Sequence, residues 1–139
     1  MSLVVDASLT LSWYFEDERT KAADAVLDAV AENGAVVPAL WRLDVANGFQ
    51  MAIRRNRIDA EFRDNALAQL AHMAITVDPD TDTYAWTGTL HIADRFRLTL
   101  YDAAYLELAQ RRHLPLATLD KPMRAAARTL TVELLGLHG

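Results

Sequence analysis

Four aspartates occupy positions where apolar runs end or where helices are expected to begin. They are Asp6, Asp44, Asp102 and Asp120. A parallel sheet brings its strand ends and helix starts to one edge, so acids that are distant in sequence can converge there. Converging carboxylates repel one another unless a cation lies among them, and Mg²⁺ or Mn²⁺ prefers such oxygen ligands. The spacing therefore predicts a metal-dependent site on an α/β scaffold.

Each aspartate also has a purely structural explanation. Asp6 can accept hydrogen bonds from the backbone amides of its own loop, and Asp102 and Asp120 can cap helices, because aspartate is among the best N-cap residues. Asp44 suits a helix interior poorly, but it can pair with a basic side chain such as Arg42. Capping and metal binding are compatible, because a carboxylate has two oxygens. The prediction of a site therefore depends on the four acids together.

Short apolar runs alternate with longer helical patterns along the chain. We expect strands at Leu3–Val5, Ala35–Val37, Ile75–Val77, Leu114–Thr118 and Leu130–Leu134. We expect helices at Leu9–Phe15 with Ser8 as the cap, Thr20–Ala31, Pro38–Arg54, Ala60–Met73, Thr83–Phe96, Tyr101–Arg112 and Pro122–Arg128. This alternation predicts an α/β fold with a central parallel sheet of about four to five short strands flanked by helices. No linker or repeat divides the sequence, so we expect a single domain over residues 1–139.

Composition excludes several kinds of chemistry. The 139 residues are 52% hydrophobic and include no cysteine, which rules out disulfides, thiolate metal sites and cysteine nucleophiles. The N-terminus has no basic start followed by a long apolar stretch, so it does not resemble a signal peptide. No run reaches the roughly 18 apolar residues that a membrane helix needs. We therefore expect a cytoplasmic protein that makes no membrane contact.

The net charge is −5, which by itself argues weakly against a nucleic-acid partner. The four aspartates named above account for most of this charge, and a bound cation would offset it further. Lys121 and Arg124 follow Asp120 closely, so they are candidates for contacts with a phosphate backbone. The negative net charge of the chain therefore does not exclude a polyanionic substrate.

Four segments carry a family resemblance. The first is Val4–Ser8, with the sequence Val-Val-Asp-Ala-Ser, and the second is Val37–Asn47, which runs from Val-Pro to Leu-Asp-Val-Ala-Asn. The third is Leu98–Leu106, with the sequence Leu-Thr-Leu-Tyr-Asp-Ala-Ala-Tyr-Leu, and the fourth is Leu116–Asp120, with the sequence Leu-Ala-Thr-Leu-Asp. In order and spacing they resemble the PIN domain, and more closely the VapC-type toxins of bacterial type II toxin–antitoxin pairs. The resemblance covers essentially the whole chain and implies a single PIN-like domain.

The resemblance also implies roles for particular residues. Asp6, Asp102 and Asp120 match the acidic metal-site positions of the family, and Thr118 matches a hydroxyl position that supports the site. Ser8 and Asn47 also match positions of the family site. Asp44 stands where the family usually carries glutamate, and aspartate has roughly 1.5 Å less reach. Either its carboxylate reaches a metal through water, or the site is weakened.

By the same resemblance, the expected activity is that of a Mg²⁺- or Mn²⁺-dependent endoribonuclease that hydrolyses RNA phosphodiester bonds. The expected partners are RNA and a cognate antitoxin protein, and the expected assembly is a homodimer or a toxin–antitoxin hetero-oligomer. The apolar helix faces near Trp13 and Trp41 are candidate dimer surfaces.

Two alternatives of other classes stay open. One is an inactive PIN-like module that acts by binding a partner protein, with Asp44 marking the decay of the site. The other is an aspartate phospho-acceptor signalling domain, which also gathers aspartates around Mg²⁺ at strand ends. Against the second alternative, Asp6 has no neighbouring acid in the sequence, and Asp102 is expected to open a helix.

Overall fold

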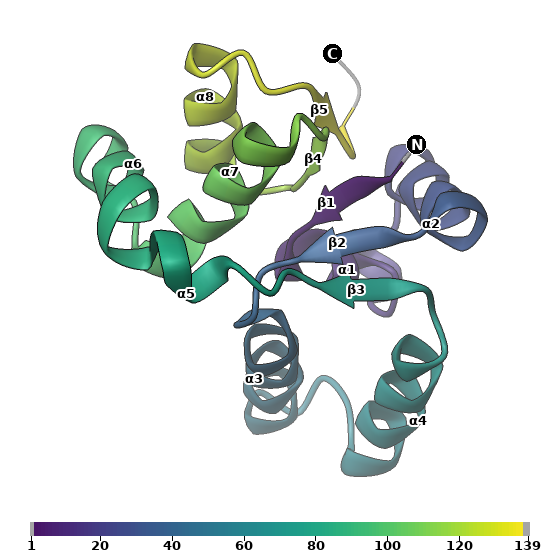
Figure 1. Cartoon of the computed structure of the whole chain (residues 1–139). Helices are drawn as coiled ribbons and strands as arrows, with labels where there is room; N and C mark the ends of the chain where they lie inside the picture. Colours follow the sequence, from purple (N-terminus) through teal and green to yellow (C-terminus); the bar gives the residue numbers. More distant parts are fainter. Residues whose placement is uncertain (1, 138–139) are drawn as a thin grey trace.

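The computed structural model describes residues 2–137, and a five-stranded parallel sheet lies at its centre in the order β3-β2-β1-β4-β5 (Figure 1). The two central pairings place Val4 opposite Val36 on one side and opposite Leu116 on the other. The predicted α/β class and strand number are confirmed. The strands are β1 (Leu3–Val5), β2 (Ala35–Val37), β3 (Ile75–Val77), β4 (Leu116–Ala117) and β5 (Leu134–Leu135).

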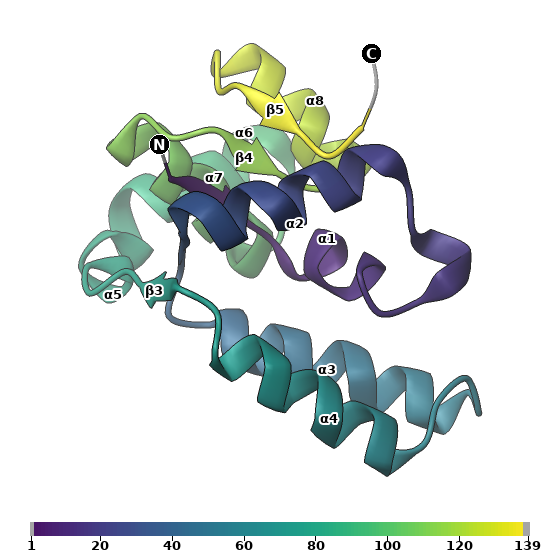
Figure 2. The ribbon, with the colours of Figure 1, turned by 90° about the vertical axis from the view of Figure 1, so that its right-hand side faces the viewer.

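Helices lie on both sides of this sheet, and Figure 2 shows that α3 and α4 run side by side as a pair. Because of this cover, β1 and β2 are buried along their whole length, as expected for apolar strands of a parallel sheet. The helices are α1 (Ala7–Ser12), α2 (Lys21–Asn33), α3 (Trp41–Arg54), α4 (Ala60–Ala71), α5 (Thr81–Tyr84), α6 (Leu90–Phe96), α7 (Leu100–Arg112) and α8 (Lys121–Thr129), with a 3₁₀ turn at Glu16–Glu18 and a π-helical turn, η2, at Ala85–Thr89.

The last two strands are shorter than predicted. At the start of β4, the left-handed His113 ends α7, and the next amide, Leu114 N, donates to Ala109 O in the last turn of that helix. At the start of β5, the left-handed Thr131 and the hydrogen bond from Val132 N to Ala127 O end α8 in the same way. The sequence pattern extended both strands into these helix-terminating turns.

The helix predicted over Thr83–Phe96 is interrupted by η2. A π turn has more residues per turn than an α-helix, so side chains after η2 do not continue the helix face formed by the residues before η2. Trp86 is 88% exposed and Leu90 is 40% exposed, whereas Ala93 is buried. These three residues therefore do not share one buried face.

Trp13 and Trp41 are 4% and 5% exposed, so their side chains belong to the core of the chain, and the use of the neighbouring helix faces in a dimer stays a prediction. The expected start of a helix at Pro38 is corrected. Pro38 lies before α3 and not inside it, because its carbonyl closes a turn with Trp41 N.

Among residues 2–137, no helix is both long and apolar enough to cross a membrane.

Candidate functional site: an acidic pocket at the strand ends

Asp6 lies at the carboxyl end of β1 and forms the N-cap of α1. Its Oδ1 accepts a hydrogen bond from Leu9 N at 2.9 Å and another from Ser8 Oγ at 2.8 Å. Its Oδ2 accepts a hydrogen bond from Thr118 Oγ1. The predicted cap, Ser8, therefore lies inside the first turn and donates to the true cap. Asp6 is thus a carboxylate that is only 3% exposed and is held by three donors.

Burial dominates the electrostatics of this carboxylate. Burial raises the pKa of Asp6, hydrogen bonds from Thr118, Leu9 and Ser8 lower it, and the nearby charge of Asp120 raises it again. The net result is a pKa of about 6. Proton binding at Asp6 is therefore much easier than at an ordinary aspartate, and a nearby cation would favour the ionised form.

Thr118 connects two of the predicted acids. The residue is fully buried directly after β4. Its hydroxyl donates to Asp6 and accepts a hydrogen bond from Asp120 N at 3.0 Å. Asp120 in turn caps α8, because its Oδ2 accepts from Met123 N at 3.0 Å. Thr118 and Asp120 are therefore joined through a loop hydrogen bond, because β4 ends one residue before Thr118.

Asp102 lies in the first turn of α7 but is not its cap. Thr99 is the N-cap, and its Oγ1 accepts a hydrogen bond from Asp102 N at 3.1 Å. The structural explanation of Asp102 as a cap is therefore wrong. Burial raises the pKa of Asp102, and so do the charges of Asp120 and Asp44. These charge effects indicate that the three carboxylates are close enough to repel one another.

Asp44 comes from the first turn of α3 and faces α7. Its Oδ2 accepts a hydrogen bond of 2.9 Å from the hydroxyl of Tyr105, which is itself only 1% exposed. Burial raises the pKa of Tyr105 strongly, and the charges of Asp44, Asp6 and Asp102 raise it further, so the phenol stays protonated. Tyr105 was missed as a site residue. The available signal was its spacing of three residues from Asp102, which places both on one face of α7.

All four predicted acids line one pocket of about 240 Å³ between α1, α3, α7 and the start of α8. Ser8 and Asn47, which the family resemblance placed at the site, also line it, and Tyr105 contributes to its wall. The full lining is Asp6, Ala7, Ser8, Leu11, Asp44, Asn47, Gly48, Asp102, Tyr105, Asp120 and Met123. We call this the acidic pocket. The fold therefore brings together carboxylates from four separate segments of the chain.

The donor set of the acidic pocket suits a hard divalent cation. Its charged groups are all carboxylates. Burial raises the pKa values of Asp6 and Asp102, the charges of neighbouring carboxylates raise them further, and a cation would oppose both effects. Within residues 2–137, however, no three His, Cys, Asp or Glu side chains are arranged around a common point as metal ligands. Binding would therefore use side-chain rotation or bridging waters, and Mg²⁺ commonly keeps several of its waters.

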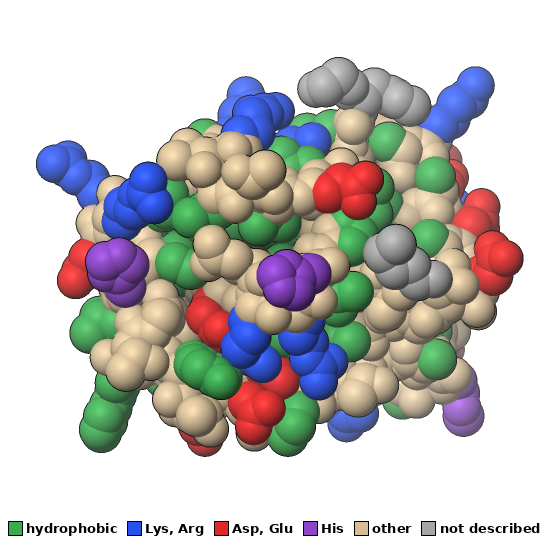
Figure 3. Space-filling view, turned by 45° about the horizontal axis from the view of Figure 1, so that its top comes forward, with side chains coloured by type: hydrophobic (Ala, Val, Ile, Leu, Met, Phe, Trp, Pro, Cys, Tyr) green, Lys and Arg blue, Asp and Glu red, His purple; other side chains and the backbone are tan. Residues whose placement is uncertain are grey.

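The two predicted phosphate contacts have different surroundings. Arg124 is 5% exposed, and its Nη1 donates to Thr118 O at 2.8 Å and to Leu135 O at 3.0 Å. This side chain holds the backbone after β4 and β5 together, so it is not available to RNA. Lys121 is exposed at the start of α8. On the face shown in Figure 3, Lys and Arg side chains stand at separate points and form no continuous basic patch.

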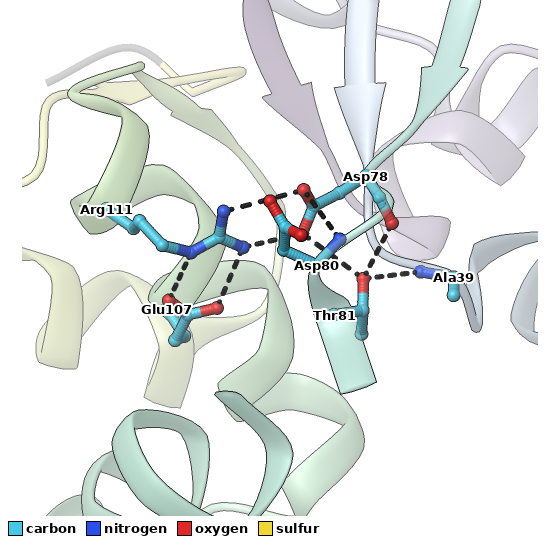
Figure 4. Close-up of polar contacts among 6 residues, drawn as sticks. All are labelled: Ala39, Asp78, Asp80, Thr81, Glu107 and Arg111. Carbon is cyan, nitrogen blue, oxygen red and sulfur yellow. Dashed lines mark hydrogen bonds and ion pairs between the residues drawn. The ribbon is translucent and has the colours of Figure 1, made fainter. Parts of the chain in front are cut away.

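A buried ion cluster lies further along α7 and was not predicted. Arg111 donates to both Glu107 oxygens, at 2.7 and 3.1 Å, and to Asp78 Oδ2 at 2.5 Å (Figure 4). Thr81 Oγ1 donates to Asp78 O at 3.2 Å and accepts from Ala39 N at 3.0 Å. These contacts tie α7 to the end of β3 and to the loop that leads into α3. The cluster therefore fixes the two helices that carry Asp44 and Asp102.

Comparison with known proteins adds to this geometry. Residues 3–129 match the family model of the PIN domain. The chain is 28% identical over 123 residues to a protein named Ribonuclease VapC3 from Pyrobaculum aerophilum, and the match covers 88% of this chain and 92% of that relative. Among solved structures, it resembles PAE2754 from Pyrobaculum aerophilum with a TM-score of 0.66 and 22% identity, over 91% of this chain and 84% of the other. At that identity the likeness concerns the fold alone.

Proposed function

Because this chain belongs to the PIN domain family, we propose that it is a metal-dependent endoribonuclease and the toxin component of a toxin–antitoxin pair. The observation that carries the proposal is the convergence of Asp6, Asp44, Asp102 and Asp120 on one pocket. The similarity to a protein named Ribonuclease VapC3 supports RNA as the substrate. The proposed reaction is hydrolysis of an RNA phosphodiester bond.

We assign the carboxylates distinct roles in this reaction. Asp6, Asp102 and Asp120 would hold Mg²⁺ or Mn²⁺, and Asp44 would complete the metal site or position the attacking water. When bound, such a cation lowers the pKa of a bound water and offsets the charge that develops on the phosphate. Thr118 would fix the orientation of Asp6 through its hydroxyl, and Tyr105 would hold Asp44. Lys121 is the remaining candidate for a contact with the RNA backbone.

The surface beside the acidic pocket supports an extended ligand. A second pocket shares Ser8, Leu11, Gly48 and Asp120 with it and continues toward Arg55. An RNA strand that occupies both pockets would place a phosphate at the acids while Arg55 contacts another phosphate.

A cognate antitoxin would compete for the same surface by placing a basic side chain among the acids. A homodimer or a toxin–antitoxin hetero-oligomer is the expected assembly, which light scattering with and without the antitoxin tests.

Cleavage of labelled RNA by purified, antitoxin-free protein tests the function. The reactions contain Mg²⁺, Mn²⁺ or EDTA, and they compare wild type with Asp6→Asn, Asp102→Asn and Asp28→Asn. Asp28 is exposed on α2 and does not line the acidic pocket, so its substitution is the matched control for the loss of one carboxylate. We expect metal-dependent cleavage by wild type and Asp28→Asn and a loss of at least 100-fold in the other two variants, on the order of the effect of removing one catalytic group.

Folded wild type that cuts none of a diverse set of RNAs would contradict the nuclease proposal. The partner-binding module would then become the better explanation, and capture of the antitoxin without any cleavage would support it. Transfer of a phosphoryl group from a small phosphodonor to an aspartate would instead support the signalling alternative. Equal cleavage by all variants would place the active site outside the acidic pocket.

A further inference from the structure

The hydrogen bond between Tyr105 and Asp44 joins two helices across the acidic pocket. The two residues are 61 positions apart in sequence, and their hydrogen bond is 2.9 Å long. Asp44 is partly exposed at the pocket wall, whereas Tyr105 is buried, so the phenol reaches the acid from the core side. Within the described residues, Oδ2 of Asp44 accepts this bond and Oδ1 accepts none. One oxygen of Asp44 is therefore held and the other remains free to bind a ligand.

We propose that Tyr105 is a positioning residue that holds Asp44 so that its free oxygen serves the metal-binding site. This inference rests on the proposed function, because it assigns Asp44 a role in binding a divalent cation. A carboxylate that approaches a metal usually has its other oxygen fixed by a hydrogen bond from a neighbouring group, and that group affects the affinity for the metal. Tyr105 is the only side chain within residues 2–137 that donates such a bond to Asp44.

The short side chain of Asp44 makes this support important. Asp44 belongs to α3, while Asp102, which also lines the pocket, belongs to α7. Tyr105 lies three residues after Asp102, so both face the pocket from the same side of α7. The hydrogen bond therefore fixes Asp44 relative to the helix that carries Asp102. A free aspartate on α3 would sample other rotamers and face the cation for less of the time.

The arrangement also explains why the hydroxyl matters apart from the ring. The ring of Tyr105 packs in the core, and phenylalanine would fill the same space. Tyr105→Phe therefore removes one oxygen atom and leaves the packing in place. Tyr101→Phe is the matched control, because Tyr101 lies on the same helix, is 67% exposed and donates no hydrogen bond within the described residues.

The test measures binding of Mn²⁺ alone and, separately, cleavage of a labelled RNA. Free Mn²⁺ is followed by electron paramagnetic resonance for wild type, Tyr105→Phe, Tyr101→Phe, Asp44→Asn and the double variant Tyr105→Phe/Asp44→Asn. We expect Tyr105→Phe to weaken Mn²⁺ affinity by about 10- to 100-fold and Tyr101→Phe to leave it unchanged. In the Asp44→Asn background, loss of the Tyr105 hydroxyl should have no further effect, because its partner is already altered.

Kinetics separate positioning from general destabilisation. At saturating Mn²⁺, we expect Tyr105→Phe to lower kcat while the KM for RNA stays at the wild-type value. Cooperative unfolding by urea should persist in every variant.

Three outcomes would contradict the inference. The first is Mn²⁺ affinity in Tyr105→Phe equal to that of wild type. The second is a loss of Mn²⁺ affinity in the double variant that equals the sum of the losses caused by Tyr105→Phe and Asp44→Asn separately. The third is loss of cooperative unfolding in Tyr105→Phe, which would make the hydroxyl a structural group. A wild-type protein that neither binds Mn²⁺ nor cuts RNA would instead contradict the proposed function itself, and the inference would fall with it.

Discussion

Thr118 and Asp6 are 112 residues apart in sequence, and a hydrogen bond from the Thr118 hydroxyl to the Asp6 carboxylate joins the ends of the adjacent strands β4 and β1. The same hydroxyl accepts a hydrogen bond from Asp120 N, so one buried group orients two of the proposed metal ligands. This contact is also the strongest hydrogen-bond influence that lowers the pKa of Asp6. Thr118 therefore affects both the stability of the strand ends and the charge of the site.

Thr118→Val should destabilise the metal-free protein by about 1–3 kcal/mol, because it leaves buried polar partners without their hydrogen bonds. The pKa of Asp6 should rise further, and RNA cleavage at neutral pH should fall. Thr118→Ser keeps the hydroxyl and should retain most of the activity. Urea unfolding and carboxyl NMR titration measure the two effects. Equal stability and equal Asp6 titration in Thr118→Val and wild type would contradict the role assigned to the hydroxyl.

The raised pKa of Asp6 predicts an unusual pH dependence of the metal-free protein. Burial and the charge of Asp120 raise the folded-state pKa from 3.8 to about 6, against the opposing hydrogen bonds. The folded chain therefore binds this proton more tightly than the unfolded chain does. The resulting stabilisation is fully present below about pH 4 and is lost as the pH rises through about 6. The shift of about two units corresponds to about 3 kcal/mol.

Urea unfolding in EDTA at pH 4, 5, 6 and 7 measures this contribution as the stability difference between wild type and Asp6→Asn. We expect wild type to lose about 2 kcal/mol relative to Asp6→Asn over this range, because part of the full contribution is already lost at pH 4. Asparagine still caps helices well, so the comparison retains the start of α1. A stability difference that stays constant with pH would show that Asp6 titrates at its ordinary value.

Divalent cations should stabilise the folded protein through the acidic pocket. If Mn²⁺ binds only the folded state, a concentration of 100 times its Kd adds about 2.7 kcal/mol to the unfolding free energy. The gain should be largest near neutral pH, where the carboxylates are ionised, and it should be lost in Asp102→Asn. Asp28→Asn is the control that keeps the gain. Calorimetric melting with Mn²⁺ and with EDTA checks this, and an equal gain in Asp102→Asn would place the bound cation elsewhere.

Arg111→Met should cost about 3–5 kcal/mol, because it leaves the buried carboxylates of Asp78 and Glu107 without their cation. Burial alone raises the pKa of Asp78, but the hydrogen bonds from Arg111 and Asp80 N, together with the charges of Arg111 and Arg112, hold the pKa below its usual value. That pKa should rise in Arg111→Met. Arg112→Met, which alters an exposed neighbour, should stay within about 0.5 kcal/mol of wild type. Urea unfolding compares the two variants, and equal stabilities would assign the ion cluster no structural role.

Local patterns along the chain predicted which segments form the sheet and where the acids lie relative to it. Short apolar runs at Leu3–Val5 and Ala35–Val37 predicted their strands correctly, because burial on both faces of a parallel sheet demands continuous apolar residues. The strand at Ile75–Val77 was also predicted correctly, although it lies at the edge of the sheet and is largely exposed. Asp6 and Asp120 were placed at strand ends by the same local pattern. Local signals were sufficient here, since each depends on residues that are neighbours in the chain.

The interactions among these groups depend on how distant segments pack in three dimensions. Tyr105 and Asp44 lie on different helices, and the partners of Arg124 are backbone carbonyls that carry no sequence signal. Trp86 lies inside a π turn that local periodicity does not reveal, and it is exposed. Hydrogen bonds and buried charges depend on distances of a few ångströms between segments that are far apart in sequence. Those distances are set by the packing of helices on the sheet, so no local pattern contains them.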